Sequence, residues 1–447
     1  MQTPNLNHIN VQLADLSQHY NIEAGKVFLV YAPLAGVFFL ADADTVQRLE
    51  SAVKNKGDKE CEELLEQLSV CSEDYKNRIV DDPSKFTHLS ILPNLVCNLS
   101  CAYCYSAKGR SKTEIDQSHL KTILDYFIDK QRTDSSQLSI FISGGGEPLI
   151  SWEKLRFLFD YSRKKADEQE FLLDISLMTN GTLITSDIVR ELKKYEVNVG
   201  VSFEILSDVQ NSQRGHFEKV SENIQLLLNM GLVPSISSVI TPLNVDRMEE
   251  MVNKVVTSYP NIRHLNFDPA MSNTLFPSTE NLEAFYRKFA RNFFIAKEIS
   301  CKYGITLDCN IVRKSEKLFP RYCQGKLCLT PEGKISICHS VSSPKEEAYP
   351  KVIYGEINNE RLIFDTKRFK SFIDERTYLL PQCQSCIARW HCAGGCMMYR
   401  MNYSEAQFKT VCQFTAYTIA EILLKRLDAS YRHEQGQSIQ QLLDLNS

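Results

Sequence analysis

Apolar and polar positions repeat with two different periods between residues 88 and 303. Short apolar runs rich in β-branched residues predict six strands, at residues 88–96, 138–142, 171–178, 197–203, 233–240 and 262–267. A stretch with helical periodicity follows each run, at residues 114–131, 151–168, 186–195, 217–230, 245–258 and 279–303. In residues 217–230, for example, Val220, Ile224, Leu227 and Leu228 fall on one stripe. Alternating strands and helices predict an α/β fold with a parallel sheet.

The number of β–α units narrows this prediction. Six units rather than eight favour an open, partial (β/α)6 TIM-like barrel, although a doubly wound sheet gives the same one-dimensional pattern. In both arrangements, ligands bind at the loops that follow the carboxyl ends of the strands. The chemistry of this chain is therefore expected in the segments directly after the predicted strands.

The first 87 residues have a different pattern. Apolar residues 26–31 and 36–40 flank the turn segment 32–35, which predicts a β-hairpin, and helical patterns follow at residues 43–54 and 59–68. This predicts a small α+β module, either a peptide-recognition element or a plain structural extension. A module of this kind can capture a peptide by adding a strand to the edge of its sheet.

The length, charge and apolar content of the chain exclude some classes of function. A chain of 447 residues is long enough for more than one domain. Its 51 basic and 55 acidic residues give a net charge of -4, which argues against a broad basic surface for nucleic acid. No apolar run predicts a membrane span, and the polar start lacks the pattern of a signal peptide. We expect a cytoplasmic protein that binds neither nucleic acid nor a membrane.

The 15 cysteines are unevenly placed, with ten of them between residues 301 and 412. In a cytosolic chain, clustered cysteines favour metal ligation over disulfides. Four cysteines have no closely spaced partner and are expected to be buried thiols: Cys61, Cys71, Cys301 and Cys309.

Two motifs stand directly after the first two predicted strands. The first holds three thiols, those of Cys97, Cys101 and Cys104, and the second is the glycine run Gly144, Gly145 and Gly146 with Glu147. Three thiolates leave one iron of a 4Fe–4S cluster open, and glycine lets backbone approach a small molecule. Taken singly, the motifs also allow a zinc site completed elsewhere and a tight turn. Together they resemble the CxxxCxxC and GGEP signatures of radical S-adenosylmethionine (SAM) enzymes.

The resemblance implies a SAM site built from further residues. Gly144, Gly145, Gly146 and Glu147 correspond to the segment that contacts the amino end of SAM. Tyr103 corresponds to the aromatic residue beside the adenine, Asn180 and Ser202 to ribose contacts, and Arg214 to the partner of the methionine carboxylate. This family often has Ser-Leu-Asp-Gly at the end of the fourth strand, where this chain has Ser202, Phe203, Glu204 and Ile205. The resemblance to radical SAM enzymes also implies that SAM is cleaved reductively to a radical that abstracts hydrogen from the substrate.

The C-terminal cysteines form a second pattern, which resembles the SPASM extension and its two auxiliary 4Fe–4S clusters. The resemblance assigns Cys323, Cys328, Cys338 and Cys396 to one cluster. It assigns Cys383, Cys386, Cys392 and Cys412 to the other. From the residues alone, the cysteines at 383–396 equally allow one zinc ribbon-like site. With eight thiolates both auxiliary clusters would be fully ligated, so we expect them to transfer electrons.

Proteins of this layout mostly modify peptides, and residues 1–87 resemble a RiPP recognition element. We therefore expect four parts: an N-terminal winged-helix-like module (1–87), a radical SAM partial barrel (88–305), a SPASM domain (306–425) and a tail (426–447). The expected partners are a precursor peptide or protein and an electron donor such as flavodoxin or ferredoxin.

The predicted activity is that of an oxidoreductase-type radical SAM peptide maturase that crosslinks, epimerises or oxidises its substrate. One alternative is an anaerobic sulfatase-maturating enzyme, although His339 stands where that branch carries an aspartate after Cys338. Another is a non-catalytic iron–sulfur or zinc protein. The sequence identifies no catalytic proton donor or acceptor, and His339 is expected to be either a surface residue or a proton carrier.

Overall fold

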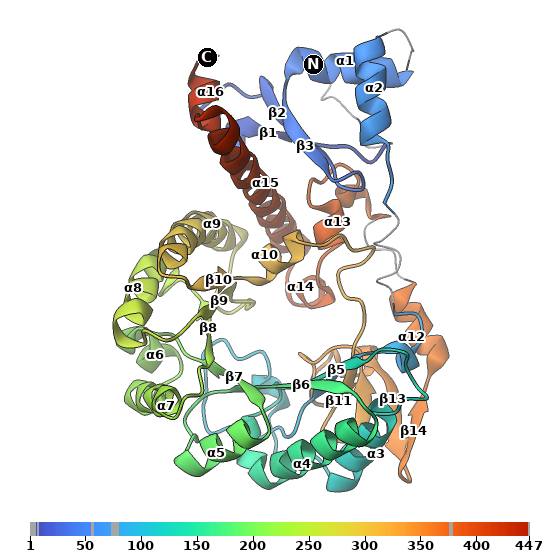
Figure 1. Cartoon of the computed structure of the whole chain (residues 1–447), viewed down its shortest axis with the longest axis vertical. Helices are drawn as coiled ribbons and strands as arrows, with labels where there is room; N and C mark the ends of the chain where they lie inside the picture. Colours follow the sequence, from blue (N-terminus) through green and yellow to red (C-terminus); the bar gives the residue numbers. More distant parts are fainter. Residues whose placement is uncertain (1–5, 7–8, 55–57, 73–79, 375–378, 446–447) are drawn as a thin grey trace. The chain divides into compact units, whose positions relative to one another are not determined.

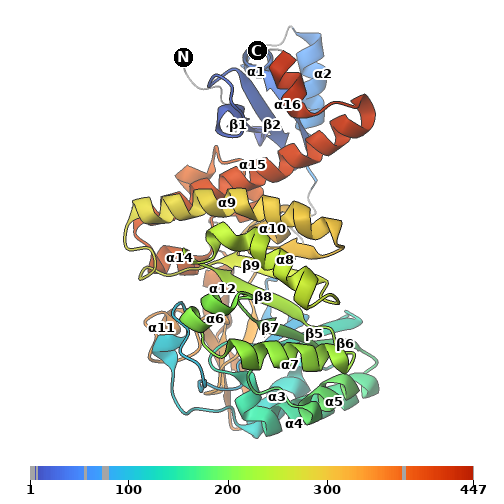
Figure 2. The same cartoon turned by 90° about the vertical axis from the view of Figure 1, so that its left-hand side faces the viewer.

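The computed structural model describes residues 6, 9–54, 58–72, 80–374 and 379–445 (Figures 1 and 2). Contacts divide the chain into two compact units. The first contains Met1–Ile79, Asn310–Gln324 and Glu375–Ser447, and the second contains Val80–Cys309 and Gly325–Asp374. These units group the segments differently from the four predicted domains, which remain a prediction.

The second unit is built on one sheet whose first seven strands are parallel and follow chain order. They are β4 (His88–Ile91), β5 (Gln137–Ile142), β6 (Leu172–Thr179), β7 (Val197–Ser202), β8 (Ser235–Ile240), β9 (His264–Pro269) and β10 (Thr306–Asp308). Strands β4–β9 confirm the six predicted strands. The three-residue strand β10 was not predicted, because it is too short to show a period.

Helices connect these strands and cover the sheet. They are α3 (Gln117–Phe127), α4 (Trp152–Glu168), α5 (Ser186–Lys194), α6 (Ser207–Gln213), α7 (Phe217–Asn229), α8 (Met248–Ser258) and α9 (Thr279–Lys302). In Figure 1 the strands from β5 to β10 follow a curved arc, with α4, α5, α7, α8 and α9 on its outer side. Helix α7 buries Val220, Ile224 and Leu227 as predicted, because its apolar stripe faces the core.

Four further strands extend this sheet beyond β4. They are β11 (Leu327–Leu329), β12 (Lys334–Ser336), β13 (Ile353–Asn358) and β14 (Arg361–Phe364), with the short helices α11 (Tyr349–Val352) and α12 (Thr366–Ile373). Strand β11 runs parallel to β4 and aligns Cys328 with Ser90, whereas β11 to β14 are antiparallel. Because β10 and β14 are the two ends of the strand order, the described sheet is open rather than a closed barrel.

The first unit combines the N-terminal sheet with C-terminal helices. Its strands are β1 (Gln12–Asp15), β2 (Val27–Ala32) and β3 (Val37–Asp42). Its helices are α1 (Ala43–Lys54), α2 (Lys59–Leu68), α10 (Asn310–Ser315), α13 (Arg389–Cys392), α14 (Met397–Asn402), α15 (Glu405–Gln435) and α16 (Ile439–Leu445). The predicted hairpin and both N-terminal helices are confirmed, and Val30, Val46 and Leu49 lie at the centre of their core.

Short 3-10 turns lie at Leu16–Gln18, Pro83–Lys85, Ala107–Gly109, Pro148–Ser151, Val245–Arg247 and Pro381–Cys383. Across the parts of the chain that the structure describes, no helix combines the length and the apolar character needed to cross a membrane.

Candidate functional site

The three-cysteine loop follows β4, as predicted. Cys97, Cys101 and Cys104 are all half-buried. Burial raises the pKa of the Cys101 and Cys104 thiols, so a bound cation would be needed to hold both as thiolates at neutral pH. Arg110 donates a hydrogen bond from Nη2 to Sγ of Cys104 at 3.1 Å. The sequence predicts no role for Arg110, since no motif marks a residue six positions after the third cysteine.

The glycine segment packs directly against this loop. The amide of Gly146 donates to the Asn94 carbonyl at 2.9 Å, and the amide of Glu147 donates to the Val96 carbonyl at 2.7 Å. A Cβ atom on Gly146 would lie 1.8 Å from that Val96 oxygen, so only glycine allows the approach. This close backbone contact explains why the two motifs occur together.

The side chain of Asn94 also joins the glycine segment to the cysteine loop, a role that the sequence did not predict. It is fully buried, and its Nδ2 donates to the Glu147 carbonyl at 3.0 Å and to Ser151 Oγ at 2.8 Å. Its Oδ1 accepts from the Val96 amide at 3.0 Å. A buried asparagine just after a strand is a signal that could have identified it, because buried amides need partners.

Glu147 uses its carboxylate inside the protein. The Thr179 hydroxyl, the Asn180 amide and the Leu149 amide donate to it at 2.6, 2.7 and 3.1 Å. Burial raises the pKa of the Glu147 carboxyl, and these three hydrogen bonds oppose the rise. The carboxylate therefore ties the segment after β5 to the end of β6, and its contact with SAM stays a prediction.

Asn180 lies beside the first cysteine. Its Nδ2 donates to Asn98 Oδ1 at 2.9 Å and lies 3.9 Å from Sγ of Cys97, while its Oδ1 accepts from Thr182. Ser202 is half-buried at the last position of β7 and is aligned with Ser237 of β8. Both residues thus lie at the carboxyl ends of the strands, where they were expected.

Tyr103, Glu204 and Arg214 meet in one buried group. The Tyr103 hydroxyl donates to Glu204, and Nη1 of Arg214 donates to the Tyr103 hydroxyl at 2.9 Å and lies 3.8 Å from Glu204 Oε1. Burial raises the pKa of Glu204 to about 7, against the charge of Arg214, which lowers it. The sequence assigned no role to Glu204, because this residue departs from the family pattern. In the structure Glu204 lies at the centre of this group.

Three buried polar atoms near the cysteine loop have no hydrogen-bond partner among the described residues: Nε of Arg110, Nε of Arg214 and Oε1 of Gln213. The backbone of Gln213 also accepts a hydrogen bond from the Ala102 amide at 3.0 Å, inside the loop. A guanidinium donor left over in a buried position fits an anionic group, and an amide oxygen fits a donor. The residues present therefore suit a zwitterion such as the methionine end of SAM.

The C-terminal thiols are also grouped. Burial raises the pKa of Cys386 to about 11 and of Cys412 to about 12, and the neighbouring thiols Cys383, Cys386 and Cys412 add to the rise at Cys392. These four cysteines belong to the first unit and lie close enough to interact. In the same way Cys396 interacts with Cys323, and Cys328 with Cys338. Whether those two pairs share one cluster remains a prediction, because they belong to different units.

Among the described residues, no group of three or more His, Cys, Asp or Glu side chains is placed so that it could hold a metal ion. A zinc site brings all its thiolates within about 2.3 Å of one point. Ligands of a cluster each bind a different iron and do not converge in this way.

The structure also tests the predictions for the four isolated cysteines and for His339. Cys61 and Cys309 are buried as expected, but Cys71 and Cys301 are exposed, so the prediction is wrong for them. His339 is half-buried, and its Nδ1 lies 2.6 Å from Nζ of Lys326. Burial, with Lys326, lowers the pKa of His339 to about 3, so it is a neutral acceptor for the lysine.

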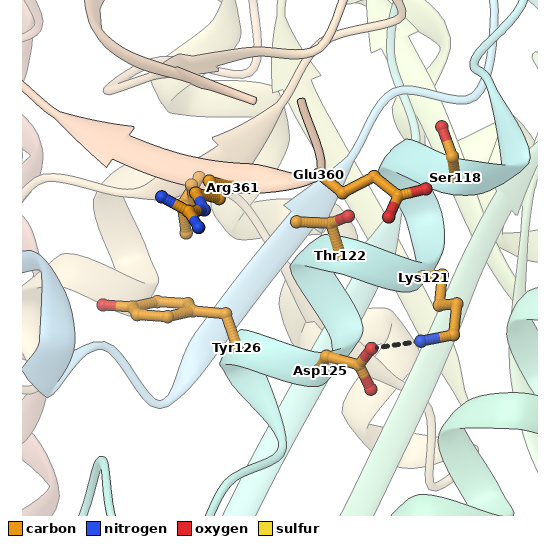
Figure 3. A pocket seen from close by; sticks show the side chains of 8 residues that line it. Ser118, Lys121, Thr122, Asp125, Tyr126, Glu360 and Arg361 are labelled. Carbon is orange, nitrogen blue, oxygen red and sulfur yellow. Dashed lines mark hydrogen bonds and ion pairs between the residues drawn. The ribbon is translucent and has the colours of Figure 1, made fainter. Parts of the chain in front are cut away.

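A pocket of about 480 Å³ lies elsewhere in the second unit, between α3 and the turn before β14 (Figure 3). Its lining includes Lys121, Asp125, Tyr126 and Arg361. Lys121 and Asp125 form an ion pair at 2.7 Å, drawn as a dashed line in Figure 3. Of the predicted site residues, none is among those that line it.

Comparisons of sequence agree with this geometry. The sequence model of the Radical SAM superfamily matches residues 91–255. The radical SAM cyclopropyl synthase TigE of Paramaledivibacter caminithermalis is 25% identical over 336 residues, which cover 67% of this chain and 66% of TigE. A cysteine-type anaerobic sulfatase-maturating enzyme of Clostridium novyi is 22% identical over 324 residues, which cover 67% of this chain and 84% of that enzyme.

Solved structures show the same fold. Native anSMEcpe with bound AdoMet superposes with a TM-score of 0.59 at 17% identity, covering 75% of this chain and 98% of anSMEcpe. Streptococcus suis SuiB bound to precursor peptide SuiA gives a TM-score of 0.51 at 15% identity, covering 89% of this chain and 97% of SuiB. The chain therefore contains a radical SAM domain and shares the fold of anSMEcpe and SuiB.

Proposed function

We propose that this chain is a radical SAM maturase that modifies a ribosomally made peptide. The observation that carries the proposal is that backbone contacts join the three-cysteine loop after β4 to the glycine segment after β5 and to the segment of the buried Arg214 beyond β7. The Gly146–Asn94 and Ala102–Gln213 backbone contacts join these parts into one site. A purely structural cysteine loop gives no reason for the buried Nε of Arg214 to lack a hydrogen-bond partner.

When bound, a 4Fe–4S cluster and SAM supply a 5′-deoxyadenosyl radical, which removes hydrogen from an unactivated carbon. The chain's own residues bind and orient. Cys97, Cys101 and Cys104 would hold the cluster, Arg214 offers a charge to the methionine carboxylate, and Tyr103 offers its ring to the adenine.

A peptide substrate is supported by the relatives. SuiB has been solved bound to the precursor peptide SuiA, and anSMEcpe has been solved with the Cp18Cys peptide bound. The sulfatase-maturating alternative has its own support, since that relative covers 67% of this chain. Against it, a neutral His339 paired with Lys326 stands where that branch carries an aspartate.

The grouping of Cys383, Cys386, Cys392 and Cys412 supports one auxiliary cluster of the SPASM type. The second cluster, at Cys323, Cys328, Cys338 and Cys396, is proposed from the resemblance. Because eight thiolates saturate two clusters, these would exchange electrons rather than bind the substrate. A flavodoxin or ferredoxin would deliver the electron that starts the reaction. The triple variant C97A/C101A/C104A tests this assignment. It should lose SAM cleavage and keep about eight irons, since the auxiliary thiolates are untouched.

The deciding experiment measures SAM cleavage by reduced, reconstituted protein, with and without the peptide encoded beside its gene. We expect methionine and 5′-deoxyadenosine, together with a changed mass or stereocentre in the peptide. Formation of formylglycine in a sulfatase peptide instead would favour the alternative. Reconstituted protein that releases no 5′-deoxyadenosine above background would leave only the non-catalytic function.

The N-terminal sheet is the proposed binding site for the leader of that peptide. In the described part of the sheet β3 pairs only with β2, so its outer edge is available for another strand. Deleting residues 1–87 is a poor test, because His19 pairs with Glu421 at 3.0 Å and stacks on Tyr417 within the same unit. The deletion would therefore disturb α15 as well.

Point variants on the two edges of the sheet give a cleaner test. Leu40 of β3 and Ala14 of β1 both align with Leu29 of the central strand, so they share one face at opposite edges. Leu40→Lys should weaken peptide binding at least about tenfold, while SAM cleavage without peptide persists. The matched control Ala14→Lys should bind the peptide normally. Equal effects of the two variants would contradict a β3 binding site.

A further inference from the structure

Glu204 is a fully buried carboxylate to which neither the family pattern nor the comparisons assign a role. It lies two residues after β7. Besides Tyr103 and Arg214, it receives the Val239 amide, which donates to Oε2 at 3.1 Å. A buried carboxylate with these three partners is compensated in charge and fixed in direction. Arg214 in turn has 8% of its side chain exposed, and within the described parts of the chain no other carboxylate lies at ion-pair distance from it.

A second route connects Glu204 to Arg214 through Gln210, which is fully buried. Its Oε1 accepts from the Glu204 amide at 2.9 Å, and its Nε2 donates to the Gly215 carbonyl at 2.9 Å. The Arg214 amide also donates to the Gln210 carbonyl at 2.8 Å. Gln210 therefore fixes the backbone on both sides of the ion pair, and the two charged side chains approach each other from anchored positions.

The backbone next to Glu204 is strained. Ile205 is fully buried and has a φ of 67°, in the left-handed region that β-branched residues avoid. The related pattern has glycine here, which adopts this conformation without strain. Strained backbone persists where the surroundings over-determine it, and it concentrates at functional sites. In this chain the strained residue directly follows the carboxylate that pairs with Arg214.

We infer that Glu204 is a positioning residue, whose carboxylate holds the Arg214 guanidinium and the Tyr103 hydroxyl in the orientation that receives the carboxylate end of SAM. The inference rests on the SAM site of the proposed function. Nη1 of Arg214 is engaged by Tyr103 and Glu204, whereas its buried Nε has no hydrogen-bond partner and is available to the ligand. Without Glu204 the guanidinium would lose its fixed direction.

The test is a double-mutant cycle on cluster-loaded, full-length protein without peptide. SAM affinity is measured by equilibrium dialysis, and iron content and thermal unfolding are measured in parallel. Glu204→Gln should weaken SAM binding by about tenfold, the effect of one charge-assisted hydrogen bond. Arg214→Gln should weaken it at least as much. The double variant should bind SAM no more weakly than Arg214→Gln alone, because Glu204 acts through Arg214.

Stability provides the second readout. Each single variant leaves one buried charge uncompensated and should lower the melting temperature, whereas the double variant removes both charges and should recover part of that loss. The exposed Glu222→Gln is the matched control and should bind SAM as the wild type does.

Three outcomes would overturn the inference. They are unchanged SAM affinity in Glu204→Gln, an equal loss of affinity when Glu204→Gln is added to Arg214→Gln, and loss of the cluster from Glu204→Gln alone. Failure of the proposed function gives a different result, since wild-type protein would then not bind SAM at all.

Discussion

The hydroxyl of Tyr31 lies 2.8 Å from Nε2 of His391, and the two rings are nearly parallel. This contact joins β2, near the start of the chain, to α13, which ends at the proposed cluster ligand Cys392. Both residues are buried, and the other ring nitrogen of His391 lies 3.0 Å from the carbonyl of Lys317. The N-terminal sheet is therefore part of the same compact unit as Cys383, Cys386, Cys392 and Cys412.

Tyr31→Phe should destabilise this unit. It removes one hydroxyl and leaves the buried Nε2 of His391 without a partner, which costs about 1–3 kcal/mol. Chemical denaturation should show this loss in the free energy of unfolding. Tyr303→Phe, at an exposed tyrosine in the other unit, should have no effect. An equal change in both variants would mean that the Tyr31 contact is not formed in solution.

Gly146→Ala should abolish SAM binding and lower the melting temperature. Its Cβ would lie 1.8 Å from the Val96 carbonyl oxygen, which is backbone and cannot move aside cheaply. Gly200→Ala is the control, because its Cβ would meet side-chain ends and no backbone: the flexible end of Met178, and Oγ of Ser235 at 3.2 Å. SAM affinity and thermal unfolding check the prediction. Normal SAM affinity in Gly146→Ala would contradict the close packing of the glycine segment on the cysteine loop.

Arg110→Gln should make the reduction potential of the SAM-binding cluster more negative. Hydrogen bonds to the ligand sulfur atoms and nearby positive charge both favour the reduced, more negative cluster, and Arg110 supplies both to Cys104. Lys112→Gln removes the same charge from an exposed position two residues away and should change the potential little. A redox titration followed by electron paramagnetic resonance measures the difference. Equal shifts in the two variants would show that the sulfur contact has no effect of its own.

Asp125 should make stability depend on pH in the acid range. Burial opposes ionisation, but hydrogen bonds from Lys121, Lys165 and Tyr161 outweigh it and lower the pKa of Asp125 to about 2. Because the folded pKa lies below the unfolded value of roughly 3.9, the ionised group stabilises the protein above that value. This stabilisation is lost as the pH falls towards the folded pKa.

The difference in the free energy of unfolding between wild type and Asp125→Asn should therefore be largest above about pH 4 and should shrink towards pH 2. Denaturation series at several pH values give this curve. A difference that stays constant with pH would mean that the carboxylate is not selectively stabilised in the folded state. Asp134→Asn, at an acidic residue outside this cluster, serves as the reference.

The fold could be predicted well where the signal is local. Strands β4–β9 follow from apolar runs, and the N-terminal hairpin and its two helices follow from alternation and turn residues. Short elements such as the three-residue strands β10 and β11 were not predicted, because three residues are too few to show a repeat of apolar and polar positions. The junction of β11 with β4 also escaped, since it pairs residues 327–329 with residues 89–91 and no local pattern records such a pairing.

The site divides in the same way. The sequence by itself determined the three-cysteine loop, the glycine segment and the C-terminal thiols, because their chemistry depends on residue type and on spacing along one short segment. Only the tertiary structure decided that Asn94 locks the two motifs together, that Arg110 contacts Cys104, and that Glu204 lies between Tyr103 and Arg214. The Asn94 and Glu204 contacts join segments that follow different strands, so they exist only after the sheet has brought the carboxyl ends of its strands to one edge. The Arg110 contact lies within one loop and depends on how that loop folds.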